Sequence, residues 1–125
     1  MSDIRQFETG ATRDTNKNKP DYRGFYSVLV ARRFGEYMHT HRLQADGSLR
    51  ESDNWKKGIP EIEYVSSGDR HWMDIKECYE ALQFGYFSNV NLEDALCAML
   101  FNVQGLLHEV VKARLEGEYN AKSLQ

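Results

Sequence analysis

Residues 69–102 read DRHWMDIKECYEALQFGYFSNVNLEDALCAMLFN and predict two amphipathic helices joined by a short polar turn. Apolar residues recur at spacings of three and four on both sides of the turn, which places them on one face of each helix. The stripe of the first helix comprises Val65, Gly68, Trp72, Ile75, Tyr79 and Leu82, and that of the second comprises Leu92, Leu96, Met99, Val103, Leu106 and Val110. We therefore expect the two helices to pack antiparallel through these stripes.

Acidic residues border both stripes. Asp74 lies at the edge of the first stripe, Glu93 flanks the second, and Asp94 lies further round the same helix. Carboxylates gathered at a helix–helix contact are costly unless a positive group lies between them, so a divalent metal is the expected partner. The alternative is that Glu93 and Asp94, in the first turn after the N-cap residue Asn91, only complement the helix dipole.

Size and composition favour one globular domain, since the chain has 125 residues, a net charge of −3 and 41% hydrophobic residues. The mild acidity argues against a nucleic-acid-binding surface. No apolar run approaches the length of a membrane span, and the first residues carry no signal region. Cys78 and Cys97 lack the spacing of a zinc or redox motif, so reduced thiols in a cytoplasmic protein are expected.

Residues 1–20 predict an extended arm, because their Gly, Thr, Asn and Lys residues show no apolar period. The arm concentrates positive charge, including Arg13 and Lys19, and could fold over an anionic substrate. A disordered terminus is the alternative. Residues 21–125 are expected to form a single helical domain.

Residues 44–60 predict a long loop, which begins near the turn pair Asp46-Gly47 and closes at Pro60. Asn54, Trp55 and Lys57 are its notable side chains. A loop tryptophan followed by lysines could stack on a base and neutralise phosphate. Alternatively, Trp55 plugs the loop onto the core.

The predicted helices span residues 22–42, 60–84 and 92–115, so the expected fold is an all-α, compact bundle of about three to four helices. Asp21 is the expected N-cap of the first helix. Phe101 lies on the back of the last helix, and it would need cover from a further helix or a second subunit. We therefore expect a homo-oligomer.

Four segments resemble a protein family of bacteriophages and prophages. They are TGATRDTNKNKPD (9–21), RFGEYMHTHRLQADGSLRESDNWKKGIP (33–60), SGDRHWMD (67–74) and LEDALCAMLFNVQGLLHE (92–109). The family is described as dATP/dGTP diphosphohydrolase-domain proteins and is related to the all-α, MazG-like nucleotide pyrophosphohydrolases. The MazG-like proteins carry an EExxE run and a later ExxD, where this chain has RHWMD with Glu77 and then Glu93-Asp94 with Asn102.

The resemblance implies a magnesium-dependent hydrolase, with manganese as a second candidate ion, that splits a (deoxy)purine nucleoside triphosphate into monophosphate and pyrophosphate. It implies the metal ligands Asp74, Glu93 and Asp94, and the catalytic residues His71, Asp74 and Asp94. The implied substrate-binding residues are Arg13, Lys19, Lys57 and Arg70 for the phosphates and Asn54, Trp55 and Asn102 for base and sugar. For His71, which lies at a helix edge, the alternative is a core histidine with satisfied hydrogen bonds. The alternative function is a non-catalytic helical phage protein that binds a nucleotide or a protein.

Overall fold

The computed structural model describes residues 3–123. The chain separates into two compact units, residues 1–30 and residues 31–125, and each unit has its own internal organisation.

The first unit contains a β-hairpin where the sequence predicts an extended arm. Strands β1 (Ile4–Gln6) and β2 (Thr12–Asp14) pair antiparallel, with Arg5 opposite Arg13. The hairpin closes through Gly10, whose positive φ of 91° suits glycine. The predicted arm is therefore locally ordered, and Arg13 belongs to its second strand.

The predicted helix 22–42 is wrong as a single element. It divides into α1 (Tyr22–Phe25) and α2 (Val28–Thr40), because Tyr26 takes an extended conformation. Ser27 then starts a new helix, since its Oγ accepts a hydrogen bond from the Val30 amide at 3.2 Å. The expected N-cap is confirmed, because Asp21 Oδ1 accepts a hydrogen bond from the Gly24 amide.

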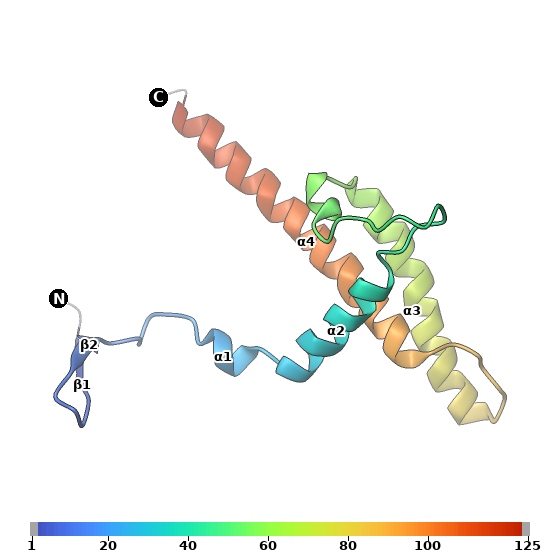
Figure 1. Ribbon diagram of the computed structural model, residues 1–125, viewed down its shortest axis with the longest axis horizontal. Helices are drawn as coiled ribbons and strands as arrows, with labels where there is room; N and C mark the ends of the chain where they lie inside the picture. Colours follow the sequence, from blue (N-terminus) through green and yellow to red (C-terminus); the bar gives the residue numbers. More distant parts are fainter. Residues whose placement is uncertain (1–2, 124–125) are drawn as a thin grey trace. The chain divides into compact units, whose positions relative to one another are not determined.

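The second unit is built on two long helices, α3 (Glu61–Phe84) and α4 (Leu92–Ser123), which pack along one another (Figure 1). Helix α3 ends at Gly85 in the left-handed conformation, and Asn91 caps α4 by accepting a hydrogen bond from the Asp94 amide. Both ends of the connection thus follow from local sequence signals, and the predicted cap at Asn91 is confirmed.

The segment 44–60 is more ordered than a featureless loop. A β-bridge joins Leu43 to Leu49 across the turn at Gly47. The short 3-10 helix η1 (Asn54–Lys57) follows, with Trp55 in its first turn. This segment reaches α4 through Trp55, whose ring meets that of Phe101 edge-on at a centroid distance of 6.3 Å.

The helix faces that are buried differ from the predicted stripes. The buried residues are Tyr64, Gly68, Ile75 and Ala81 on α3, and Ala95, Cys97, Ala98, Asn102 and Gly105 on α4. Gly68 and Ile75 were predicted correctly. Among the other predicted members, Val65, Trp72, Tyr79, Leu82, Leu96, Val103 and Val110 are exposed, and Leu92, Met99 and Leu106 are half-buried. The prediction failed because small residues, which let two helices approach closely, line the contact in place of the large apolar ones.

The expected all-α class with three to four helices is confirmed, since helices dominate the described residues and the β-hairpin is small. Helix α4 extends beyond the predicted end at Leu115. None of the helices in residues 3–123 combines the length and apolar character needed to cross a membrane.

Candidate functional site

A cleft of about 570 Å³ lies within the second unit, between the end of α2, the segment after it, α3 and α4. Its lining combines basic, amide and aromatic side chains with the carboxylate of Glu51. They include His39, His41, Arg42, Arg50, Asn54, His71 and Asn102, together with Tyr37, Trp55 and Phe101. This volume falls in the range typical of small-molecule sites, and the mixture of basic and aromatic groups suits an anion that carries a ring.

Four of the side chains singled out from the sequence meet at this cleft. They come from three elements: Asn54 and Trp55 from η1, His71 from α3, and Asn102 from α4. Lys57, Arg70 and Asp74 lie outside its lining. Arg13 and Lys19 belong to the first unit.

Trp55 has two roles in this geometry. Its ring lies edge-on to His108 at 4.9 Å and to Phe101 at 6.3 Å, so it holds η1 against α4. The alternative in which Trp55 plugs the loop onto the core is therefore confirmed. The same side chain also lines the cleft, and the Lys56 ammonium lies 5.7 Å from its ring centroid.

Asn102 is the one strongly buried polar residue among the described core residues, with 5% of its surface exposed. Its Nδ2 donates a hydrogen bond to the Ala98 carbonyl at 2.8 Å, one turn earlier in α4. This bond fixes the orientation of the amide at the wall of the cleft, which lowers the entropic cost of using it to recognise a ligand.

Two histidines of the cleft have defined neighbours. His41 Nδ1 lies 2.8 Å from the Tyr37 carbonyl, and the rings of the two residues are tilted by 33° with their centroids 4.0 Å apart. A carbonyl only accepts, so Nδ1 carries the proton and Nε2 is left to bind a ligand. His71 Nδ1 lies 3.6 Å from Asp74 Oδ2, a contact that becomes an ion pair when the imidazole is protonated.

Glu93 and Asp94 face a cation that the sequence reasoning missed. Arg33 of α2 donates from Nε to Glu93 Oε1 and from Nη2 to Asp94 Oδ1, both at 2.7 Å. The hydrogen bond to Asp94, followed by that to Glu93, raises the pKa of Arg33 above its ordinary value. These carboxylates therefore already have a positive partner, in addition to the helix N-terminus on which they lie.

The predicted metal ligands are not gathered around one point. Within the part of the chain that the structure describes, no three His, Cys, Asp or Glu side chains lie close enough to hold a metal ion. Asp74, with 46% of its side chain exposed, has room for a ligand beside His71. Glu93 and Asp94 fit a magnesium ion only if Arg33 leaves them, so the magnesium site stays a prediction.

Arg42 and Arg50 are cleft residues that sequence reasoning did not select. The Arg50 amide donates to the Arg42 carbonyl at 2.7 Å, and Arg42 Nε donates to the Arg50 carbonyl at 2.8 Å. The Asp46-Gly47 turn, flanked by Leu43 and Leu49, was the available signal, because such a turn closes a hairpin and sets these arginines opposite one another.

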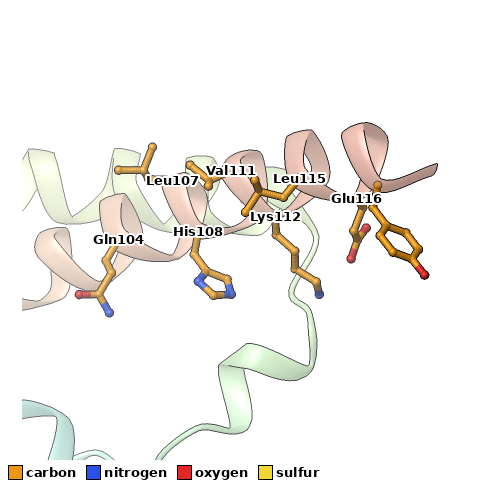
Figure 2. A pocket seen from close by; sticks show the side chains of 8 residues that line it. Gln104, Leu107, His108, Val111, Lys112, Leu115 and Glu116 are labelled. Atoms are coloured by element: carbon orange, nitrogen blue, oxygen red, sulfur yellow. The ribbon is translucent and has the colours of Figure 1, made fainter. Parts of the chain in front are cut away.

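A second hollow runs along α4 and differs from the cleft in its construction. Figure 2 shows Gln104, His108 and Lys112 projecting from one side of the helix and Leu107 and Val111 from another. All its lining residues belong to this one helix, so no second element closes it. We therefore take the cleft as the candidate site.

Comparison of the chain with models of protein families, with curated proteins and with solved structures finds no match.

Proposed function

We propose that the cleft binds a purine nucleoside triphosphate, with dATP or dGTP preferred, and that the protein hydrolyses it to the monophosphate and pyrophosphate. One observation carries the binding part of this proposal. One cleft is lined by four residues that the sequence singled out, Asn54, Trp55, His71 and Asn102. The same cleft is lined by the basic residues Arg42 and Arg50, which the sequence did not single out.

The basic wall is assigned to the phosphates. Arg42 and Arg50 supply guanidinium groups, which pair with phosphate oxygens through parallel hydrogen bonds. His41 adds Nε2, which donates to an anion once the ring is protonated. Lys57 and Arg70, outside the lining, remain proposed as further phosphate contacts.

The aromatic and amide groups are assigned to the nucleoside. Trp55 offers an aromatic surface on which a base can stack, and such stacking tolerates any base. Asn54 and Asn102 present amides that can both donate and accept, as the edge of a purine requires. The preference for purines and for deoxyribose rests on the resemblance to the diphosphohydrolase-domain family.

Hydrolysis is supported by that resemblance and by the pair His71 and Asp74. His71 lies at the cleft and can take a proton from an attacking water, while Asp74 at 3.6 Å favours the imidazolium that forms. Magnesium or manganese, held by Asp74 and by the triphosphate itself, would neutralise phosphate charge. Such a substrate places the proposed activity in the cytoplasm of a phage-infected host.

A second candidate function is binding without catalysis, of a nucleotide or of a protein. The contacts of Arg33 favour it, because they pair Glu93 and Asp94 with a side chain of the same chain. In this case the two carboxylates stabilise the contact between α2 and α4, and a nucleotide bound in the cleft is not hydrolysed.

Product analysis separates the two functions. The protein is incubated with each common nucleoside and deoxynucleoside triphosphate and with magnesium, and the products are resolved by anion-exchange chromatography. The proposal expects monophosphate and pyrophosphate in equal amounts, and loss of turnover in His71→Ala and Asp74→Ala. Binding of dATP or dGTP without any product would leave the non-catalytic function, and absence of both binding and turnover would refute the proposal.

A further inference from the structure

Helix α3 carries an exposed apolar stripe that differs from its buried face. The stripe follows the spacing 3-4-3-4-3 and comprises Ile62, Val65, Asp69, Trp72, Lys76 and Tyr79, with Leu82 one turn further on. Val65 is 44% exposed, Trp72 50% and Tyr79 60%. Large aromatic and aliphatic side chains arranged with this periodicity normally pack against another helix.

This stripe lies on the side of the α3–α4 pair away from the cleft. On the cleft side, Trp55 packs on Phe101 and Arg33 pairs with Asp94. Phe101 directly precedes the buried residue Asn102 in α4, and Asp94 directly precedes the buried residue Ala95. The stripe residues of α3 instead come one position after the buried face, as Val65 follows Tyr64. In antiparallel helices such positions lie on opposite sides of the pair.

Helix α4 continues the apolar surface on the same side. Leu96, Leu100 and Val103 come one or two positions after the buried residues Ala95, Ala98 and Asn102 of α4. Their exposed fractions are 48%, 36% and 50%. Gly68 of α3 lies against Met99 and Asn102, so Leu96 and Leu100 are at the level of the middle of the α3 stripe. The stripe and these leucines therefore form one apolar face, which we call the α3 face.

We propose that the α3 face binds a second copy of this chain, with the two α3 helices running antiparallel across Trp72. The order of residues in the stripe carries this inference. When Trp72 meets Trp72 of the second copy, Asp69 lies opposite Lys76 and Val65 lies opposite Tyr79.

The two-fold symmetry of such a contact makes each of these pairs occur twice. Opposite charges then face one another at both ends of the central tryptophans, and apolar residues meet beyond them. An unrelated partner has no need of a stripe that is complementary to itself in both charge and apolar character. The second copy is therefore the occupant that this pattern fits.

Charge reversal tests the contact. The wild-type chain, Asp69→Lys, Lys76→Asp and the double variant are compared by sedimentation equilibrium, and circular dichroism checks that each keeps its helix content. Glu63→Lys is the matched control, because Glu63 is an exposed charge of α3 outside the stripe. We expect a wild-type dimer, and a dissociation constant raised by about tenfold or more in each single variant, because two like-charge contacts replace two attractive ones.

The double variant restores opposite charges in exchanged positions, so its dissociation constant should return close to that of the wild type, and the control should not change it. A wild-type mass of one chain at about 100 µM, a concentration at which even weak homodimers populate, would overturn the proposal. So would single variants that dimerise as tightly as the wild type, because the interface would then lie elsewhere.

Discussion

Gly105 of α4 lies directly against the ring of Tyr64 of α3, so closely that a Cβ at this position would overlap Cε1 and Cζ of the ring. Tyr64 is 2% exposed, so its ring is enclosed by the residues around it. The contact explains why a glycine, which weakens a helix, occurs in the middle of α4. It also fixes the spacing of α3 and α4, on which one wall of the cleft depends.

Gly105→Ala should therefore destabilise the protein, by about 1–3 kcal/mol for an overfilled contact. Urea unfolding followed by circular dichroism measures this effect. Gly117→Ala is the control, because Gly117 is exposed in the same helix and a Cβ there meets nothing within 4 Å. The control should gain about 0.5–1 kcal/mol from better helix propensity. Equal stability of the two variants would show that the contact with Tyr64 is unimportant.

Tyr64→Phe should leave stability unchanged or raise it. The Tyr64 hydroxyl and Glu109 Oε1 are both buried without a hydrogen-bond partner among the described residues. A buried unpaired hydroxyl costs free energy, and removing it keeps the ring that packs on Gly105. A loss of more than about 1 kcal/mol in urea unfolding would mean that the hydroxyl makes a bond in solution, since that is the worth of a typical hydrogen bond.

The same tyrosine predicts a change at high pH. Burial, followed by the charge of Glu109, raises the pKa of Tyr64 above its ordinary value. The unfolded chain then releases this proton at a lower pH than the folded chain, so stability falls once the pH rises above about 10. Tyr64→Phe should reduce the slope of unfolding free energy against pH in this range. An unchanged slope would contradict the raised pKa.

Arg33→Ala should increase the affinity of the protein for magnesium. The substitution frees Glu93 and Asp94, two adjacent carboxylates that now pair with the guanidinium at 2.7 Å. Magnesium titration followed by chemical shifts of the α4 amides measures the effect, and Arg32→Ala, an exposed arginine of the same helix, is the control. Unchanged or weaker binding in Arg33→Ala would show that these carboxylates are not metal ligands.

The helices were predictable, but the faces that they bury were not. Periodicity located α3 and α4, and Asn91 marked the start of α4, because a cap depends on neighbouring residues. On α4, however, the rows Leu96, Val103, Val110 and Ala95, Asn102, Glu109 have the same spacing. Hydrophobicity predicts that the first row faces α3. In the structure the second row faces α3, because the contact of Gly105 with Tyr64 brings the two helices close together on that side.

The site was predictable in part for a similar reason. Trp55 and His71 are conspicuous in the sequence, and the structure brings both to the cleft. Arg33 and Arg50 resemble any other surface arginine until folding places one against Asp94 and the other at the cleft wall. Such pairings join residues far apart in the chain, so no local pattern reports them.

Nucleotide binding at the cleft is the central claim, and calorimetric titration of dATP and dGTP tests it most directly. The wild type is compared with Arg50→Glu, which reverses a charge of the cleft wall, and with Arg32→Glu, which makes the same change outside it. The account predicts saturable binding that Arg50→Glu weakens by about tenfold or more, as loss of a charged phosphate contact implies, and that Arg32→Glu leaves unchanged. Binding that is equal in all three proteins, or absent from the wild type, would contradict it.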